Sequence, residues 1–390
     1  MDSFERLKLL SQQMDLEPVE DAPCTLASKP GEAPFISQAV LPNGKRISLL
    51  KTLLTSACER NCFYCPFRAG RDFRRATFKP DELASTFMRL HYAGAAQGIF
   101  LSSGIIGGGV RTQSLLIDSA EILRSKLGYT GYLHLKIMPG AEFEQVRHAM
   151  HLADRVSINL EAPNSLRLGM LAPTKHYLAE LLEPLRWVEQ IRQEPAPNRS
   201  WRRDWPSSTT QFVVGAVGET DLELLSTTQK LYKSFGLQRA YFSAFNPVPD
   251  TPLEHLPAES GIRQNRLYQA SFLLRDYQFD LEELPFNSSG NLPRNIDPKL
   301  YWAQSHLSEN PVEINRANRR QLMQVPGIGP KGASRILLLR RRSQINSLSE
   351  LSNLGIHTSR AAPFVLIGGR RPVHQMSLFE MSQSSSEGFP

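Results

Sequence analysis

Cysteine is scarce in this sequence, long apolar runs are missing, and the N-terminus lacks the pattern of a secretory signal. Four cysteines in 390 residues are too few for a disulfide framework, and this scarcity is typical of proteins in a reducing compartment. No stretch of about 18 consecutive apolar residues occurs, which argues against a membrane-spanning helix. The opening stretch, MDSFERLKLLSQQMDLEP, is charged and amphipathic and has no cleavage site. We therefore expect a cytoplasmic protein with no membrane partner.

Net positive charge is concentrated in one short segment. The chain carries 45 Lys and Arg residues against 38 Asp and Glu residues. Residues 312–342 hold eight of the basic residues and one acidic residue, Glu313, so the rest of the chain holds 37 of each sign. This local excess predicts that something acidic binds there. The chain is 41% hydrophobic and long enough for one large domain and a smaller one.

Three of the four cysteines lie within eight residues, in the stretch CERNCFYC. Cys58, Cys62 and Cys65 have CxxxCxxC spacing, which favours metal ligation over a disulfide. A structural zinc ion needs four ligands, and a [4Fe–4S] cluster also normally takes four cysteines. Three thiolates therefore leave one coordination position open, as in catalytic metal sites. The alternatives are a zinc site completed from elsewhere in the chain and buried structural cysteines.

The CxxxCxxC spacing, with Phe63 and Tyr64 directly before the last cysteine, resembles the radical S-adenosylmethionine (SAM) superfamily. The resemblance implies that the three cysteines bind three irons of a [4Fe–4S] cluster and that SAM chelates the fourth iron. It also implies an electron donor, because one electron from the reduced cluster cleaves SAM. The product would be a 5′-deoxyadenosyl radical that abstracts hydrogen from the substrate.

Six short β-rich runs alternate with helical segments. The runs are residues 46–54, 98–104, 131–138, 155–161, 210–216 and 239–245. The segments between them carry helical start signals or helical periodicity, as in residues 79–97, where Pro80 precedes two acidic residues and an apolar stripe. Strands that alternate with helices predict a parallel sheet.

Polar and glycine-rich residues follow the predicted strands, at the edge where parallel barrels place functional groups. The turn LSSGIIGGG resembles the superfamily's Gly-Gly-Glu-like element, and VVGAVGET resembles its GxIxGxxE element. Lys136 interrupts an apolar run and would point into a barrel if its neighbours alternate. Glu219 is predicted to cap the following helix. The residues that the resemblance implies for SAM binding are Tyr64, Ser102, Ser103, Gly104, Lys136, Asn159, Glu161 and Gly215.

Each of these positions has a structural alternative. A strand end or a helix cap would explain the turns singly, and a surface lysine at a strand end would explain Lys136.

Residues 315–342, NRANRRQLMQVPGIGPKGASRILLLRRR, contain two helix-like segments around a glycine turn. The pattern LxxVPGIGxxxAxxI resembles the helix-hairpin-helix motif of DNA-repair and recombination proteins. Two glycines let the turn approach a sugar–phosphate backbone, and amides at the next helix N-terminus donate to phosphate oxygens. The predicted DNA-binding residues are Gly327, Gly329, Lys331 and Arg335. The alternative is a hairpin used for protein packing, and residues 345–369 could be the second half of a paired domain.

Beyond Arg371 the chain turns polar and serine-rich, which is typical of a disordered tail. Within it, the sequence QMSLF resembles the peptide that binds the bacterial sliding clamp. The resemblance implies the clamp as a partner, contacted by Gln375, Leu378 and Phe379. The alternative is that the apolar pair folds back on the protein.

Cys24 is not needed by the predicted cluster. A thiol is a good hydrogen-atom donor, and the segment from Cys24 to the first strand is about twenty residues, long enough to reach the active-site face. We predict Cys24 as a candidate catalytic residue that quenches a substrate radical. The alternative is a small buried cysteine that only packs.

These predictions combine into an α/β fold: a partial (β/α)6 radical SAM barrel followed by a small all-α helix-hairpin-helix domain. The predicted boundaries are an N-terminal segment (1–45), the barrel (46–290), a linker (291–310), the helix-hairpin-helix DNA-binding domain (311–370) and the disordered tail (371–390).

The combination of barrel and hairpin resembles a bacterial family of DNA modification/repair radical SAM proteins that is often associated with uracil-DNA-glycosylase-like proteins. The stretches SLLKTLLTSAC, GYLHLKIMPG, ADRVSINLE, STTQFVVGA and DPKLYWA carry the resemblance. It implies an enzyme that repairs or modifies DNA, with DNA and a glycosylase-like protein as partners. A radical SAM enzyme that modifies tRNA is one alternative, and a non-enzymatic, clamp-tethered iron–sulfur DNA-binding adaptor is another.

Overall fold

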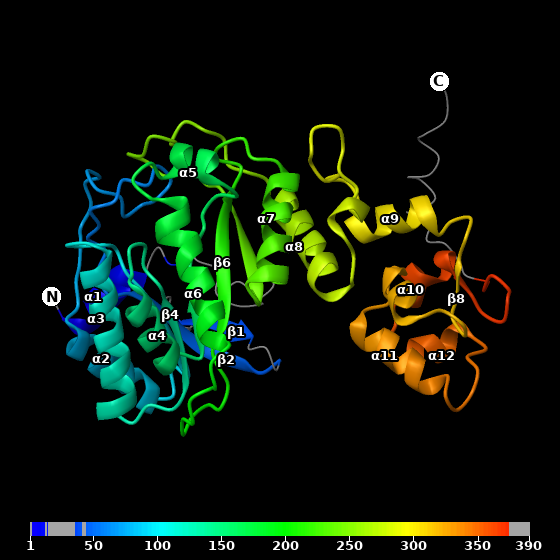
Figure 1. Ribbon diagram of the computed structural model, residues 1–390, viewed down its shortest axis with the longest axis horizontal. Helices are drawn as coiled ribbons and strands as arrows, with labels where there is room; N and C mark the ends of the chain where they lie inside the picture. The colour runs from blue at the N-terminus through cyan, green and yellow to red at the C-terminus, as the bar shows by residue number, and fades with distance from the viewer. Residues whose placement is uncertain (1, 12–13, 15–35, 41–43, 374–390) are drawn as a thin grey trace. The chain divides into compact units, whose positions relative to one another are not determined.

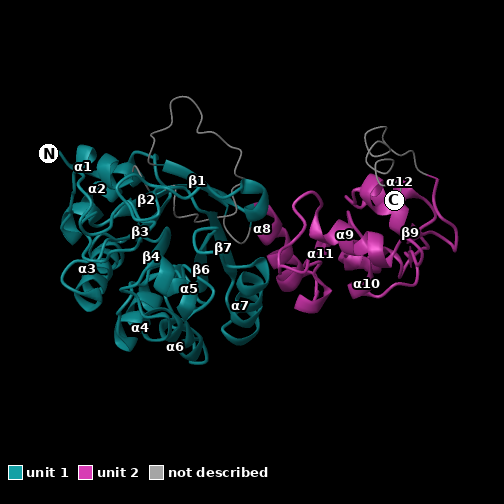
Figure 2. Ribbon diagram, turned by 90° about the horizontal axis from the view of Figure 1, so that it is seen from above, with its two compact units in different colours: residues 1–264 teal, residues 265–390 magenta. Residues whose placement is uncertain are grey.

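The computed structural model of the chain divides into two compact units, Met1–Gln264 and Asn265–Pro390 (Figure 2). The division falls within helix α8, Gly261–Asp276. The structure describes residues 2–11, 14, 36–40 and 44–373.

Two predictions fall on residues that the structure does not describe. These are Cys24 as a hydrogen-atom donor and the clamp peptide with Gln375, Leu378 and Phe379. Among the described residues, no helix combines the length and the apolar character needed to cross a membrane.

A seven-stranded sheet forms the centre of unit 1 (Figure 1). Its strands follow one another in chain order; the last six are parallel, and the first pairs antiparallel with the second. The strands are β1 (Ile36–Val40), β2 (Arg46–Leu53), β3 (Gly98–Ser102), β4 (Tyr132–Lys136), β5 (Arg155–Ser157), β6 (Ser207–Val214) and β7 (Arg239–Ala244). All six predicted strands are present, which confirms the partial (β/α)6 barrel, and β1 extends its edge.

Helices connect the parallel strands. They are α2 (Pro80–Tyr92), α3 (Gly109–Glu121), η2 (Ile122–Lys126), α4 (Phe143–Leu152), α5 (Ser165–Leu171), η3 (Tyr177–Leu182), α6 (Glu183–Arg192) and α7 (Asp221–Ser234). Helix α1 (Ser3–Ser11) precedes the sheet in the chain. Helix α2 shows why they form where they do. Pro80 occupies its first turn, the Glu82 carboxylate accepts from the Lys79 N–H at 3.1 Å, and the stripe with Leu83 and Phe87 is buried.

The two faces of the sheet differ in polarity, because successive side chains of a strand point to opposite sides. One face carries fully buried apolar residues, such as Ile99 and Leu101 of β3 and Leu133 and Leu135 of β4. Helices α3, α4, α6 and α7 lie on one side of the sheet (Figure 2), which is the side that needs an apolar surface. The opposite face, which includes Lys136, is polar and basic, and we call it the inner face.

The loop between α6 and β6 caps helix α4. Arg199 donates hydrogen bonds to the Met150 and His151 carbonyls at 2.8 and 2.7 Å, at the end of that helix. The indole N–H of Trp205 donates to the Glu194 carbonyl at 2.9 Å and holds the two ends of the loop together. The loop therefore satisfies carbonyls that a helix C-terminus leaves without partners, a role that no sequence motif indicated.

Unit 2 is mainly helical. Its elements after α8 are η4 (Leu281–Glu283), α9 (Pro298–His306), β8 (Val312–Glu313), α10 (Arg319–Gln324), α11 (Pro330–Leu339), α12 (Leu348–Asn353), α13 (Thr358–Ala361), η5 (Ala362–Phe364) and β9 (Val365–Leu366). Helix α9 lies within the predicted linker, and β8 and β9 form a two-residue parallel pair that closes the domain.

Two helical hairpins pack against each other in unit 2. The turn between α10 and α11 meets the turn between α12 and α13, where the His357 N–H donates to the Gly327 carbonyl at 3.4 Å. A Cβ on Gly327 would lie 2.4 Å from the His357 carbonyl oxygen, and its φ of +83° also requires glycine. Residues 345–369 thus pair with the first hairpin.

Candidate functional site

The cysteine loop, residues 55–70, follows β2 and lies at the carboxyl edge of the parallel sheet. Cys58 Sγ accepts a hydrogen bond from the Ile105 N–H at 3.4 Å, so the sulfur itself contacts the turn after β3. Burial raises the pKa of Cys62 and of Cys65, and the Lys175 ammonium acts in the opposite direction on both thiols. A nearby cation is the environment that a buried thiolate needs.

The arrangement of the thiols does not match a single metal ion. Within the described ranges, no three His, Cys, Asp or Glu side chains converge as the ligands of one ion would. A [4Fe–4S] cluster makes a different demand, because each thiolate binds a different iron. The donor set of Cys58, Cys62 and Cys65, three thiols on one loop that do not converge on one point, therefore fits the separate irons of a cluster.

The turn after β3 clamps the cysteine loop in place. A Cβ on Gly104 would lie 2.2 Å from the Ala57 carbonyl oxygen, so this position admits only glycine. The Glu59 carboxylate accepts from the Gly107 and Gly108 N–H groups at 3.0 and 3.1 Å. The glycine-rich turn therefore has a structural role beside the SAM contact that the sequence predicts for it.

Ser102 and Ser103 lie at the same turn and are buried. The Ser103 hydroxyl donates to the Gly104 carbonyl at 2.7 Å. The structure thus brings these three predicted residues beside the cysteine loop.

A buried acid–lysine pair lies next to the cysteines. Lys175 Nζ lies 2.9 Å from Glu161 Oε1, and both side chains are less than a tenth exposed. Burial opposes the charge of Lys175, but Cys62 and Glu161 raise its pKa above the ordinary lysine value. Burial likewise opposes the charge of Glu161, but Lys175 and Lys136 lower its pKa. Both members of the pair are therefore ionised.

Glu161 is held in a strained backbone conformation. Its φ is +65°, in the left-handed region that non-glycine residues rarely adopt. Backbone hydrogen bonds on both sides hold it there, from its own N–H to Gln211 and from the Val213 N–H to its carbonyl. Glu161 Oε2 is buried and has no hydrogen-bond partner among the described residues. A strained residue with an unsatisfied acceptor is the signature of a binding position.

Tyr64 and Lys136 act on this carboxylate, and Asn159 lies two positions before it in the chain. Burial and the Glu161 charge raise the pKa of Tyr64 well above its usual value, so its hydroxyl is protonated. Asn159 donates to the Gln211 side chain at 3.4 Å, and Lys136 is 6% exposed at the end of β4. The low exposure of Lys136 rules out the alternative of a surface lysine.

The loop after β6 is built around the Glu219 carboxylate, which does not cap α7 as predicted. The cap is Thr220, whose hydroxyl accepts from the Glu223 N–H at 3.1 Å. Glu219 turns back instead and accepts from the Gly215 N–H at 2.5 Å. The prediction failed because Thr220 is the better N-cap residue and stands one position later.

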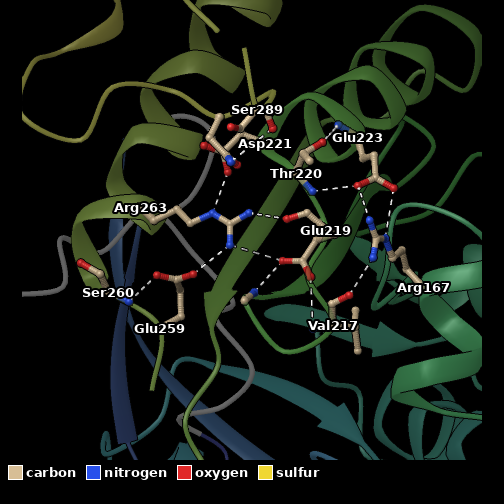
Figure 3. Close-up of polar contacts among 12 residues, drawn as sticks. Arg167, Val217, Glu219, Thr220, Asp221, Glu223, Glu259, Ser260, Arg263 and Ser289 are labelled. Carbon is tan, nitrogen blue, oxygen red and sulfur yellow. Dashed lines mark hydrogen bonds and ion pairs between the residues drawn. The ribbon is translucent and has the colours of Figure 1, made fainter. Parts of the chain in front are cut away.

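Arg263 holds this loop through its guanidinium (Figure 3). Its guanidinium lies between the Asp221 carboxylate at 2.7 Å and the Glu259 carboxylate at 2.8 Å, and it donates to the Glu219 carbonyl at 2.6 Å. A Cβ on Gly215 would lie 2.6 Å from the Glu259 side chain. Contacts within the protein thus hold the predicted SAM-contact loop, and nothing in the sequence near Gly215 indicated the arginine.

In the hairpin of unit 2, some predicted DNA-binding residues are exposed to solvent, and others make hydrogen bonds within the unit. Gly329 is the N-cap of α11, and Lys331 in the first turn is exposed. Arg335 donates to the Leu354 carbonyl at 2.8 Å and so ties the two hairpins together. Arg340 likewise donates to two backbone carbonyls of the domain.

The cations that remain available lie on the outside of the hairpin. Four exposed basic side chains make no hydrogen bond or ion pair with any residue that the structure describes. They are Arg316, Lys331, Arg341 and Arg342. All eight basic residues of 312–342 were counted as equally available from the sequence, because charge alone does not reveal which of them bind other residues of the domain.

No protein-family model matches the chain, and no curated protein matches it. Among solved structures, the FeFe-hydrogenase maturase HydG from Carboxydothermus hydrogenoformans aligns with a TM-score of 0.46 at 15% identity over 58% of this chain and 51% of HydG. Methylornithine synthase (PylB) aligns with a TM-score of 0.46 at 13% identity over 58% of this chain and 61% of PylB.

A third match is the radical SAM methyltransferase TsrM from Kitasatospora setae, with a TM-score of 0.39 at 14% identity over 56% of this chain and 39% of TsrM. The chain thus spans less than two thirds of each of these proteins. At these scores the matches assign neither a family nor an activity.

Proposed function

We propose that this protein is a radical SAM enzyme that acts on DNA, by lesion repair or by nucleotide modification. Cys58, Cys62 and Cys65 would hold a [4Fe–4S] cluster, and SAM would occupy the remaining coordination position. The observation that carries the proposal is the cysteine loop at the carboxyl edge of a parallel half-barrel, which is where such barrels place functional groups.

The residues around the loop would bind and orient SAM. The unsatisfied Glu161 Oε2 is an acceptor for hydroxyl groups, such as those of a ribose. Lys175 keeps that carboxylate ionised and supports the thiolates with its charge. Backbone at Gly104 and Gly215 would pass close to the cofactor. When bound and reduced, the cluster would supply the electron that cleaves SAM to the 5′-deoxyadenosyl radical.

DNA is favoured as the substrate by unit 2. The glycine turn at Gly327 and Gly329, the N-terminus of α11 and the exposed Lys331 form a surface suited to a phosphate backbone. The proposed partners therefore include DNA, an electron donor, the sliding clamp and a uracil-DNA-glycosylase-like protein. Cys24 remains the proposed hydrogen-atom donor.

The test of the chemistry is anaerobic reconstitution with iron and sulfide. The protein should hold about four irons per chain and form 5′-deoxyadenosine from SAM under strong reductant. Cys62→Ala should abolish this activity, and Cys24→Ala is the matched cysteine control that should retain it. Full activity in Cys62→Ala would refute the proposal.

The test of the site geometry uses two glycines. Gly104→Ala should lose most of its iron, because the new Cβ collides with the backbone that leads to Cys58. Gly169→Ala is the control, since a Cβ there meets nothing within 4 Å. Equal iron content in the two variants would contradict the packing argument.

The test of the substrate is competition between duplex DNA and tRNA for the reduced, SAM-loaded protein. Preferential binding of the duplex, together with altered nucleosides in the recovered DNA by mass spectrometry, supports a DNA enzyme. Preferential binding of tRNA would contradict a DNA substrate and favour an enzyme that modifies RNA.

A further inference from the structure

Two neutral polar side chains without hydrogen-bond partners lie together on the inner face of the sheet. Both ring nitrogens of His134 are buried and unpaired among the described residues, and the same holds for the Ser157 hydroxyl. The two side chains are 2% and 5% exposed. Strand register pairs Ser157 with Lys136, which stands two positions after His134 in β4. His134 and Ser157 are therefore diagonal neighbours on the same face.

Buried donors and acceptors without partners in the protein normally bond a water or a ligand, because leaving them unpaired costs free energy. An unpaired hydroxyl alone does not mark a site. Ser208 is also buried and unpaired, but it is aligned with Val156 on the apolar face of the sheet. His134 and Ser157 differ from Ser208, because they form a group on the inner face of a half-barrel whose carboxyl edge carries the cysteine loop.

The surroundings of His134 fix both its orientation and its charge. Its ring packs against Phe100 of β3, with ring centroids 4.5 Å apart and ring planes at 51°. Burial lowers the pKa of His134 well below its usual value, and the charges of Arg155 and Lys136 act in the same direction. The imidazole is therefore neutral and offers one donor and one acceptor, while the Ser157 hydroxyl can act as either.

We propose that His134 and Ser157 hydrogen-bond the base of a nucleotide in the substrate. The inference rests on the proposed function, since it places the base in the half-barrel that would hold the cluster and SAM. A neutral set of donors and acceptors matches a neutral group that carries both, and the edge of a nucleobase is such a group. A protonated amine is disfavoured, because Arg155 and Lys136 place positive charge near His134.

The experiment measures binding by calorimetry to the reconstituted full chain with SAM and without reductant. The probes are the four 2′-deoxynucleosides and 2-deoxyribose, which has the sugar but no base. Free nucleosides are suitable probes, because a base reaches a buried site only outside the stack of a duplex. At least one nucleoside should bind about tenfold more tightly than 2-deoxyribose, as expected for hydrogen bonds to buried groups.

Variants assign the binding to the two side chains. His134→Phe keeps a planar ring against Phe100 but removes both nitrogens, so it should weaken binding of the preferred nucleoside by about tenfold. His134→Gln restores one donor and one acceptor and should retain part of the affinity. Ser157→Ala should also lose several-fold in affinity. Ser208→Ala is the matched control and should bind as the wild type does, because it removes an unpaired hydroxyl from the opposite face.

Stability separates a binding role from a structural one. His134→Phe and Ser157→Ala remove groups that make no hydrogen bond with the described residues, so the urea midpoint of the apo protein should not fall. Lower affinity at an unchanged or higher midpoint is the pattern expected of groups that serve a ligand. A clear drop of the midpoint in both variants would show that the two groups stabilise the fold, and would overturn the inference.

Failure of every nucleoside to bind more tightly than 2-deoxyribose would also overturn the inference. Wild-type nucleoside binding in His134→Phe and Ser157→Ala would do the same, and would leave water as the partner of these atoms. The two proposals fail separately. Base-dependent binding without SAM cleavage refutes the proposed radical chemistry alone, whereas SAM cleavage without base-dependent binding refutes only the inference about His134 and Ser157.

Discussion

At the scale of single residues, the site depends on one buried carboxylate. Glu161 combines a left-handed backbone, an ion pair with Lys175 and an oxygen without a partner among the described residues. Holding such a residue costs on the order of 1–3 kcal/mol of backbone strain, which the hydrogen bonds to β6 offset. The fold therefore gives up some stability to present one acceptor at the edge of the sheet.

The pair can be tested by a double-mutant cycle. Lys175→Met should lower the free energy of unfolding by about 3 kcal/mol, because it leaves the Glu161 carboxylate charged and buried without its cation. Glu161→Gln added to Lys175→Met should recover a large part of that loss, since the carboxylate that lost its cation is then neutral. Urea titration of the apo protein under anaerobic conditions measures both values. Additive effects of the two substitutions would show that the pair is not coupled.

Single residues also show what sequence can and cannot reveal. Cys58, Cys62 and Cys65 were predictable because their spacing is a local pattern. Lys175 was not, because its partner is fourteen positions away along the chain and an isolated lysine is usually exposed. The contact of Arg335 was not predictable for the reverse reason: its charge is visible in the sequence, but the carbonyl that it binds is not.

At the scale of elements, strands were easier to predict than the turns between them. Alternating runs identified β2 to β7, but regular pairing in β5 ends at Ser157, short of the predicted Glu161. The turn of the helix-hairpin-helix segment was predictable from the sequence, because glycine and proline restrict its backbone conformation. Strand β1 was not predicted; it pairs antiparallel with β2 at the edge of the sheet.

The hairpin turn of unit 2 rests on a buried lysine. Lys299 of α9 donates from Nζ to the Ile328 carbonyl at 2.7 Å and lies 4.5 Å from the centre of the Tyr277 ring. Burial lowers the pKa of Lys299 to about 7; Asp297 opposes this shift and Arg360 adds to it. The ammonium is thus partly neutral at physiological pH directly under the predicted DNA-binding turn.

This pKa predicts a pH dependence of stability. Between pH 7 and the unfolded-state pKa of about 10.4, the unfolded chain binds a proton at Lys299 that the folded chain does not. Stability should therefore rise with pH, by at most roughly 1.4 kcal/mol per pH unit, and fall as pH drops toward 7. Urea titrations of the full chain between about pH 7 and 9, below the range in which tyrosines ionise, measure the slope.

Lys299→Met is the control for this prediction. It removes the titrating group, so its stability should change less with pH than that of the wild type, whatever its baseline. Identical slopes in the two proteins would show that Lys299 keeps an ordinary pKa.

At the scale of the whole molecule, the residues proposed for SAM cleavage and those proposed for DNA binding lie in different units. The cysteine loop, the acid–lysine pair and the basic inner face belong to unit 1, and the exposed cations of the hairpin belong to unit 2. The sequence indicated this division through its charge distribution, because residues 312–342 account for the entire net charge of +7. Binding of DNA and cleavage of SAM should then be separable by point substitution.

The separation is tested with two proteins. A triple variant, Lys331→Ala with Arg341→Ala and Arg342→Ala, should bind duplex DNA more weakly and with a smaller salt dependence. The logarithmic slope should shrink by about 0.9 for each phosphate that the variant no longer neutralises. In the absence of DNA the triple variant should still form 5′-deoxyadenosine at the wild-type rate. Cys62→Ala should show the opposite pattern, with normal duplex affinity and no SAM cleavage.

The triple variant should fold as the wild type does, because its three cations make no hydrogen bond or ion pair within the described part of the chain. A weaker duplex affinity would then report the loss of charge and not a loss of structure. An unchanged salt slope would mean that the hairpin surface does not face the phosphate backbone.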